Sequence, residues 1–434
     1  MKTHLSFSRI TKFVICVIAF VWPLSASAEP FAYITHSRDD TVSVIDTVTN
    51  TVVDTVTVGD FPFGVAVHPD GSTVYVVNNL GGLGSGSVSV IDTVSNTVVA
   101  SVTVAQNPWG IAVHPDGSTV YVANSGGSIV SVIDTTSNTV VDTISMDPPY
   151  GVAVHPGGST VYVTNSWGNA VSVIDVASNT VVDTVAVGAH PRGVAVSPGG
   201  STAYVTNQIG GTVSVIDTAT NTVVATVTVG ISPYGIAVHP DGSAVYVTNQ
   251  SNDTASVIDT ASNTVVATVM VGDLPQGVAV HPGGSNVYVT NRNSNTVSVI
   301  DTATNTVVDT VPVGNGPQAF GKFIGPLPNS LTIFPPSGKL VTTAGFDLVL
   351  IVDAVGFSVT GGTATLDDVD ISASLGSCVV PGTLISGGQT FRCPNLTGGF
   401  LGEGTHTLSV TLDLSDGSSV SDTVDWEVVG NTEP

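Results

Sequence analysis

The sequence predicts an all-β fold, a seven-bladed β-propeller, from two observations. The element Asn-Thr-Val-Val recurs at spacings of 46, 42, 41, 42, 42 and 42 residues. Its seven copies begin at Asn50, Asn96, Asn138, Asn179, Asn221, Asn263 and Asn305. Each unit divides at turn residues into four short runs rich in Val, Ile, Thr and Tyr, as β-strands are. A period near 42 with four strands per unit is typical of a propeller blade.

Residues 1–28 have the composition of a secretory signal peptide. Lys2, Arg9 and Lys12 precede an apolar run over residues 13–22, and Ala26-Ser27-Ala28 forms a small-residue cleavage site. The apolar run is short for a bilayer span, and no later stretch reaches the roughly 20 apolar residues that a membrane helix needs. We therefore expect a secreted, periplasmic or cell-surface protein with no membrane span in the mature chain.

The unit from Pro149 to Val187 illustrates the four expected strands, A to D. They read P-Y-G-V-A-V, then S-T-V-Y-V-T-N, then V-S-V-I-D, then T-V-V-D-T-V-A-V. Strands A and B are almost continuously apolar, which predicts burial on both faces, whereas strand D alternates Val with Thr or Asp. Gly151 and Ala153 leave room at a crowded axis. The sequence thus predicts antiparallel sheets that are stacked radially.

The two ends of the repeat predict how the ring closes. The chain enters the first blade at a B strand, residues 31–35, and a seventh A strand appears only after the last D strand, at residues 319–324. Pairing of these N- and C-terminal strands would complete the first blade and leave no open inner edge.

The B strands carry a recurrent motif. It reads Y-V-V-N at Tyr75, Y-V-A-N at Tyr121, and Y-V-T-N at Tyr162, Tyr204, Tyr246 and Tyr288. On this motif, residues 31–325 resemble the YVTN-repeat β-propeller family of exported surface proteins. The first unit departs from it, with His36 in place of Asn. The resemblance implies the fold but no single activity, since this family is similar both to lactonase-like propellers and to those of nitrous-oxide and nitrite reductases.

These observations divide the chain into a signal peptide at 1–28, a propeller at 29–326 and a second domain at 327–434. The period ends after residue 325, and alternating runs between Gly and Asp turns follow over about the length of an immunoglobulin-like β-sandwich. The stretch from 404 to 428 resembles the closing strands of bacterial immunoglobulin-like modules. Cys378 and Cys393 would be the two thiols of the mature chain, and in an oxidising compartment we expect a disulfide between them.

The charge balance excludes some classes of partner. The chain has 33 acidic and 9 basic residues, for a formal net charge of −24. Such a field repels phosphate backbones and anionic lipid surfaces, so we expect no nucleic-acid partner and no anionic membrane partner. An envelope or extracellular protein or glycan remains as the expected partner, and the oligomeric state is left open.

Two sets of repeated polar residues admit a metal-binding and a structural interpretation. Histidine occupies one position in five units, and Asp ends the third strand in all seven. They are His68, His114, His155, His239 and His281, with Ser197 in a sixth unit, and Asp46, Asp92, Asp134, Asp175, Asp217, Asp259 and Asp301. A residue repeated from blade to blade is expected to stabilise the structure of each blade. We therefore interpret the His as turn residues and the Asp as hairpin caps rather than as metal or calcium ligands. We expect no metal and no cofactor.

Positions that vary between otherwise similar units predict the functional surface. They gather in the D–A and B–C loops, which strand alternation places on one face of the disc. The candidate ligand-binding residues are the variable position of P-x-G, namely Phe63, Trp109, Tyr150, Arg192, Tyr234, Gln276 and Gln318, with Arg38, Trp167 and Arg292 from the B–C loops. Aromatic platforms with isolated guanidinium groups suit sugars, short peptides or carboxylates. Alternatively, the aromatic residues plug the channel and the arginines pair with Asp39, Asp40, Asp60 or Asp273.

No catalytic motif stands out, such as G-x-S-x-G, H-E-x-x-H or a phosphate loop. The sequence therefore favours a non-enzymatic recognition, adhesion or envelope scaffold protein. The alternative is a channel-sited hydrolase of lactonase type, for which Asp60, Asp147, Asp273, His36 and His190 are available, or a cofactor-carrying redox propeller, for which His36 and His190 are the unique histidines.

Overall fold

A computed structural model describes residues 30–82 and 84–325, and in the C-terminal region the strands between residues 330 and 428. The predicted signal peptide lies outside the described residues. In the described part, no helix is long and apolar enough to cross a membrane.

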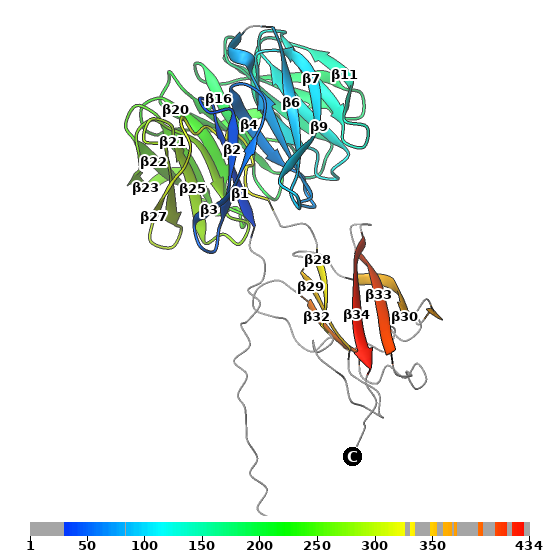
Figure 1. The fold of residues 1–434 in the computed structure, drawn as a ribbon. Coiled ribbons are helices and arrows are strands. Elements are labelled where there is room, and N and C mark those ends of the chain that lie inside the picture. The colour runs from blue at the N-terminus through cyan, green and yellow to red at the C-terminus, as the bar shows by residue number, and fades with distance from the viewer. Residues whose placement is uncertain are drawn as a thin grey trace, which may run out of the picture.

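Residues 30–325 form seven antiparallel sheets arranged around an axis, as Figure 1 shows from the blue first blade to the olive seventh. The chain is a seven-bladed β-propeller. Six sheets have four strands and the first has three. Blade 1 contains β1 (Phe31–His36), β2 (Thr41–Asp46) and β3 (Thr51–Thr57). Blade 2 contains β4 (Pro62–Val67), β5 (Thr73–Asn78), the short 3-10 helix η1 (Leu80–Gly82), β6 (Ser85–Asp92) and β7 (Thr97–Gln106).

The other blades repeat this order from the axis outward. Blade 3 contains β8 (Pro108–Val113), β9 (Thr119–Asn124), β10 (Ile129–Asp134) and β11 (Thr139–Ser145). Blade 4 contains β12 (Pro149–Val154), β13 (Thr160–Asn165), β14 (Ala170–Asp175) and β15 (Thr180–Ala186). Blade 5 contains β16 (Pro191–Val196), β17 (Thr202–Asn207), β18 (Thr212–Asp217) and β19 (Thr222–Thr228). Blade 6 contains β20 (Pro233–Val238), β21 (Ala244–Asn249), β22 (Thr254–Asp259) and β23 (Thr264–Met270). Blade 7 contains β24 (Pro275–Val280), β25 (Asn286–Asn291), β26 (Thr296–Asp301) and β27 (Thr306–Pro312).

The C-terminal region contributes seven described strands in two sheets, of orders β28-β29-β32 and β31-β30-β33-β34. They are β28 (Ser330–Phe334), β29 (Leu348–Asp353), β30 (Val359–Leu366), β31 (Val369–Asp370), β32 (Gln389–Cys393), β33 (Gly404–Leu414) and β34 (Ser419–Val428). The predicted disulfide falls outside the described residues, because Cys378 is not among them.

The glycine of each P-x-G motif is required by close contact between adjacent inner strands. A Cβ atom on Gly151 would lie 2.3 Å from the carbonyl oxygen of Arg192, and one on Gly235 would lie 2.3 Å from that of Gln276. No real Cβ atom tolerates such a distance, so only glycine lets neighbouring blades converge at the axis. The expectation of a crowded axis is confirmed.

The Tyr and Asn of the B-strand motif are buried and have structural roles. Tyr121, Tyr162, Tyr246 and Tyr288 are among the largest fully buried side chains. The Asn side chain donates a hydrogen bond to a serine of the adjacent C strand, as Asn207 Nδ2 does to Ser214 Oγ at 2.9 Å. Six blades repeat this bond, which satisfies a buried donor.

The turns between strands C and D follow the predicted chemistry. The Asp that ends strand C accepts hydrogen bonds from backbone N–H groups in its own turn, as Asp217 does from Thr220 at 2.8 Å. The Asn four residues after this Asp has a positive φ in all seven blades, 52° at Asn221 for example, a conformation that Asn tolerates well. The interpretation of the seven Asp residues as hairpin caps is confirmed.

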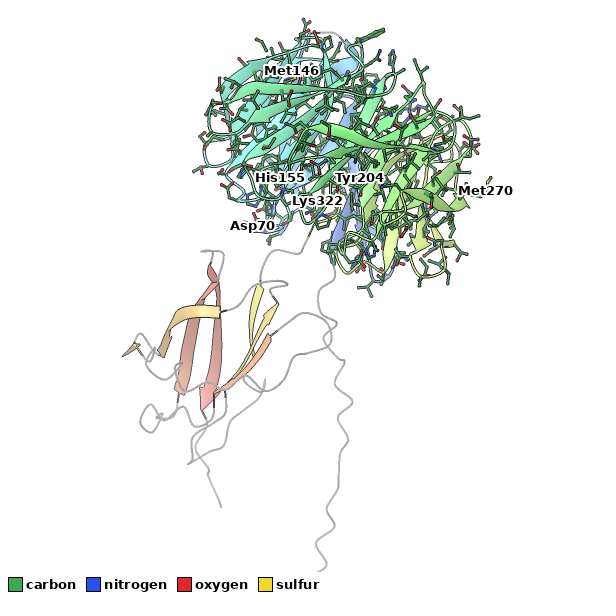
Figure 2. The ribbon with its side chains drawn as sticks, turned by 180° about the vertical axis from the view of Figure 1, so that it is seen from behind. Asp70, Met146, His155, Tyr204, Met270 and Lys322 are labelled. Carbon is green, nitrogen blue, oxygen red and sulfur yellow. The ribbon has the colours of Figure 1, made fainter. Side chains whose placement is uncertain are left out.

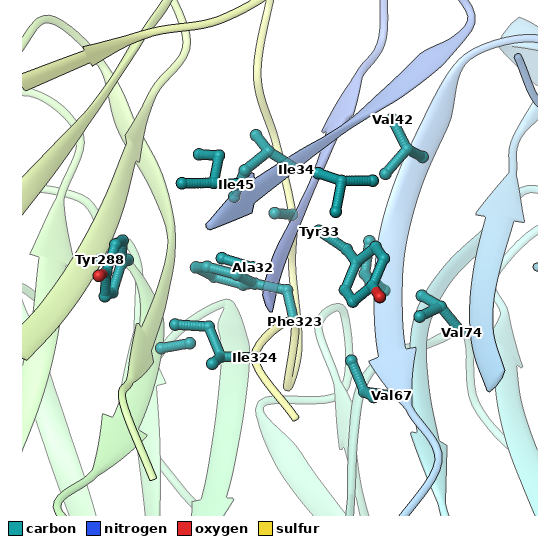
Figure 3. Close-up of a cluster of buried hydrophobic side chains, with 14 of the residues drawn as sticks. Ala32, Tyr33, Ile34, Val42, Ile45, Val67, Val74, Tyr288, Phe323 and Ile324 are labelled. Atoms are coloured by element: carbon teal, nitrogen blue, oxygen red, sulfur yellow. The ribbon is translucent and has the colours of Figure 1, made fainter. Parts of the chain in front are cut away.

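Residues 317–324 lie between β1 and β4. The backbone N–H of Tyr33 donates to the Phe323 carbonyl at 2.9 Å, and the N–H of Val67 donates to the Lys322 carbonyl at 3.1 Å. The segment forms isolated bridges, Ala32 with Ile324 and His36 with Pro317, and no regular strand. Figure 3 shows the apolar cluster around it, in which Phe323 and Ile324 pack with side chains of the first, second and seventh blades.

Candidate functional site

The propeller has two faces with different loops. The A–B and C–D turns form one, which we call the repeated face, and the D–A and B–C loops form the other, which we call the variable face. Figure 2 shows Asp70 and His155 of the A–B turns on the lower side of the disc and Met146, at the end of a D strand, on the upper side.

On the repeated face, His68, His114, His155 and His239 each contact the next blade. The Nε2 atom of His68 lies 3.0 Å from the Gly117 carbonyl oxygen of the next blade, and the equivalent distances from His114, His155 and His239 are 2.8, 2.9 and 2.9 Å. Because a carbonyl only accepts, Nε2 carries the proton. The structural interpretation of the histidines is therefore supported, and they lie opposite the variable face.

On the variable face, aromatic side chains fill the mouth of the axial channel. Phe63, Tyr150 and Tyr234 are 5 to 6% exposed and pack with Phe320, while Trp109 is partly buried beside them. Trp109 stacks on Tyr150 with ring centroids 5.1 Å apart and meets the edge of Phe63 at 4.6 Å. The hydroxyl groups of Tyr150 and Tyr234 are hydrogen-bonded to each other. These rings pack on one another rather than offering open stacking platforms.

The scaffold holds the backbone of the mouth residues through the threonine of the B-strand motif. Thr206 Oγ1 donates to the Tyr234 carbonyl at 2.8 Å and accepts from the Gly193 N–H at 2.8 Å. Equivalent threonines bond to the carbonyls of Phe63, Arg192, Gln276 and Gln318. A repeated residue thereby fixes the main chain at positions whose side chains vary.

Arg192 stands at the rim of the aromatic cluster. Its guanidinium carbon lies 4.2 Å from the ring centroid of Tyr150 and 5.9 Å from that of Tyr234, and its Nε donates to Gln208 Oε1 at 2.8 Å. Burial raises the pKa of Tyr150, and the charges of Arg192 and Arg292 oppose that effect. Both arginines thus bear on the same buried phenol at the mouth.

The two glutamines predicted to bind a ligand are buried and do not lie on an open surface. Gln276 and Gln318 are 5% and 4% exposed, and the Oε1 atom of each is buried with no hydrogen-bond partner. Gln318 Nε2 donates to Ser37 Oγ at 3.1 Å. Each glutamine thus leaves a buried acceptor at the mouth.

The predicted residues of the B–C loops belong to blades 1, 4 and 7. Arg38 is exposed, and Arg292 is partly buried with an Nε that has no hydrogen-bond partner. Trp167 is 75% exposed, and its ring centroid lies 5.0 Å from that of His190. Within residues 30–325, the ion pairs are three His–Asp pairs on the repeated face, so Arg38, Arg192 and Arg292 have no carboxylate partner there.

Two hollows adjoin these residues. A cavity of about 20 Å³ lies on the axis between inner strands, lined by Gly193, Gly235, Phe320 and equivalent positions, and has room for about one water molecule. An open groove of about 720 Å³ lies on blade 5 between residues 208–211 and 228–232. Ile209 and Ile231, 69% and 60% exposed, border it, and Gln208 links it to Arg192.

The residues available for catalysis do not form an acid–base pair. Asp60, Asp147 and Asp273 are exposed on D–A loops. His36 is 1% exposed, and its Nε2 accepts from the Gly314 N–H while Nδ1 lies 3.0 Å from Thr41 Oγ1. Burial lowers the pKa of His36 to about 4. The described residues contain no group of three or more His, Cys, Asp or Glu side chains placed to hold a metal ion.

Sequence reasoning missed several members of this surface. Phe320 belongs to the aromatic cluster but was assigned to a closing strand, although Phe320-Gly321 repeats the x-Gly order of the other mouths two residues late. Gln208, Ile209 and Ile231 were missed too. They occupy variable loop positions, which was the available signal.

The family model that matches the chain is described as "Lactonase, 7-bladed beta-propeller", and it matches residues 32–148 and 218–311. These segments lie within the propeller and leave out the strands of blade 4 and the first three strands of blade 5. No curated protein matches the chain.

Several solved structures are similar. Kuenenia stuttgartiensis hydrazine synthase is 27% identical with a TM-score of 0.57, over 62% of this chain and 92% of that one. A protein of unknown function from Desulfotomaculum acetoxidans is 20% identical with a TM-score of 0.60, over 68% and 98%. A candidate 6-phosphogluconolactonase from Bacteroides uniformis is 17% identical with a TM-score of 0.59, over 67% and 98%. The last two likenesses concern the fold alone.

Proposed function

We propose that this protein is an exported, non-enzymatic recognition protein, an adhesion or envelope scaffold, that binds a glycan, peptide or protein ligand on its variable face. Under this proposal the chain is a YVTN-repeat propeller closed by residues 317–324, and the C-terminal region is an immunoglobulin-like module that acts as a spacer or adhesive unit.

The observation that carries the proposal is the contrast in polar partners between the faces. On the repeated face, the Asp and His side chains of the turns form caps and contacts between blades. On the variable face, Arg38, Arg192 and Arg292 have no carboxylate partner within residues 30–325, although the chain is strongly acidic. Unsatisfied groups at a concave mouth favour a ligand that supplies the missing partners.

The test is co-purification of the full chain with material from its own exported fraction. Arg192→Gln and Trp167→Ala should each lose the bound component, whereas Val94→Ser, an equally conspicuous apolar residue 82% exposed on the repeated face, should retain it. Equal retention by all three variants would contradict a ligand on the variable face.

A hydrolase of lactonase type is the second candidate, and the matching family model favours it. Opening a lactone needs a base that activates water and a donor that stabilises the developing oxyanion. His190 is the remaining histidine for such a site, since His36 has both ring nitrogens engaged. Turnover of a lactone panel by the wild type that is lost in His190→Ala, with folding unchanged, would replace the recognition proposal.

A further inference from the structure

Resting on the proposed function, we propose that the groove of blade 5 binds the C-terminal residues of a peptide, with the α-carboxylate at Arg192 and an aliphatic side chain between Ile209 and Ile231. The site is thus an end-recognition site for a free carboxylate beside an apolar residue.

Arg192 is the cation that would bind the carboxylate. Arg192 lies on the face of Tyr150 and is oriented by Gln208, so its guanidinium is fixed before any ligand binds. Arg292 acts on the same tyrosine, and neither arginine has an ion pair within residues 30–325. Arginine binds carboxylates with two parallel hydrogen bonds, and a fixed guanidinium loses little entropy on doing so.

The groove supplies the rest of the recognition. Its inner end is Gln208, the same side chain that holds Arg192, so an anion at the arginine leads directly into it. Its walls include Gly210, Gly211 and Gly230, whose bare backbone lets another main chain approach closely. Ile209 and Ile231 are large apolar side chains left exposed beside it. Exposed isoleucines bordering a groove of about 720 Å³ provide contact area for one or two residues.

The ligand class follows from charge and shape together. Acidic macromolecules are repelled by a chain of net charge −24, whereas a peptide end brings a single carboxylate to the guanidinium of Arg192. Capture of a C-terminal carboxylate together with an apolar side chain is a known physical mode of peptide recognition.

The experiment is calorimetric titration of the full chain with an acetylated tetrapeptide that ends in leucine, as the free acid and as the C-terminal amide. The free acid should bind, and the amide should bind about 10- to 100-fold more weakly, because a charge-assisted hydrogen bond to the arginine is lost. Arg192→Gln should weaken the acid to the level of the amide, while Arg192→Lys should restore part of the affinity. Ile209→Ser should weaken both peptides, and Val94→Ser neither.

Equal binding of acid and amide, or no binding of the acid at millimolar concentration, would overturn the inference. If Arg192→Gln does not fold, Ile209→Ser still tests the inference, because the Ile209 side chain is exposed and its replacement should not disturb folding. Loss of the co-purified component in variable-face variants together with no peptide binding would refute this ligand class and leave the recognition proposal standing. If co-purification is also insensitive to the variable face, both fail.

Discussion

On the repeated face, the A–B turns carry histidines that bond to the next blade, and the C–D turns carry Asp and Asn that bond within the turn or adopt a positive φ. The variable face carries Arg192, Arg292 and Trp167, whose side chains make none of these repeated contacts. Both faces are built on the same strands. The difference indicates that, in a repeat protein, the contacts shared by all units specify the fold. Side chains that take no part in these contacts are available for binding.

The largest effect should follow from a repeated residue at the axis. In Gly235→Ala the new Cβ would lie 2.3 Å from the Gln276 carbonyl oxygen, and adjacent inner strands would have to separate. We expect a loss of about 3 kcal/mol of unfolding free energy. Gly199→Ala is the matched control, because no atom lies within 4 Å of its Cβ position. Thermal unfolding of the two variants checks this, and equal melting temperatures would break the comparison.

A smaller effect should follow from loss of one hydroxyl between blades. Thr206→Val removes the bond to the Tyr234 carbonyl and leaves the Gly193 N–H without its acceptor. We expect a loss of about 2 kcal/mol, since buried groups are left unsatisfied. Thr228→Val, exposed on an outer strand, should change the stability little. Denaturant unfolding of both variants measures the difference, and similar losses would show that the buried bond has no special role.

The histidine contacts should make the repeated face sensitive to pH. His68 Nδ1 lies 2.5 Å from Asp70 Oδ1, and with Nε2 on a carbonyl the ring donates through both nitrogens only when charged. In the folded state, burial acts to lower the pKa of His68, but the hydrogen bond and the negative charge of Asp70 act more strongly, and the pKa of His68 is raised. The pKa of Asp70 is lowered to about 2. A raised His pKa stabilises the fold below its unfolded value of 6.5 and ceases to do so as pH rises through the folded pKa.

The His68–Asp70 pair therefore stabilises the fold fully between about pH 4 and 6.5. The contribution of Asp70 is lost only as the pH falls from the pKa of its unfolded state, 3.8, towards its folded pKa of about 2. Asp70→Gly converts this turn to the H-P-G-G form of His155, whose Nδ1 accepts from the Gly157 N–H at 2.9 Å. We expect the wild type to exceed this variant in melting temperature by roughly 1–2 °C at pH 5.5 and by less at pH 9. A difference that grows with pH would be the wrong sign.

The smallest effect on stability should come from the variable face. Trp167 and Ile209 are 75% and 69% exposed, so replacing them removes little buried surface. We expect Trp167→Ala and Ile209→Ser to change the unfolding free energy by no more than about 0.5 kcal/mol. Circular dichroism melting curves check this. A fall of several degrees in either variant would mean that the variable loops are structural as well.

The repeat made most of the propeller predictable, because seven copies of one unit act as an internal comparison. The blade count, the strand order, the Asp caps and the axial glycines all follow from positions that do not change between units. The irregular strand position at residues 317–324 did not follow, since Ala319 takes a positive φ and the glycine of the x-Gly pair, Gly321, comes two residues late. Two extra residues in a single copy have no counterpart to compare with.

The sequence could predict which loops form the candidate surface, but not how their side chains contact one another. The variable positions were read correctly from their loops, yet the sequence does not say that Tyr150 and Tyr234 bond to each other across the axis, or that Gln208 orients Arg192. These contacts join blades 4, 5 and 6 around a ring. They depend on the radius at the mouth, which no single unit encodes.

The affinity of the full chain for the leucine-terminated free-acid peptide, compared between Arg192→Gln and His155→Gln, tests the central claim most directly. The account predicts that Arg192→Gln weakens binding about 10-fold or more with little change in melting temperature, and that His155→Gln lowers the melting temperature while the affinity stays within about twofold. Loss of affinity in His155→Gln with retention in Arg192→Gln would contradict the division of labour between the two faces.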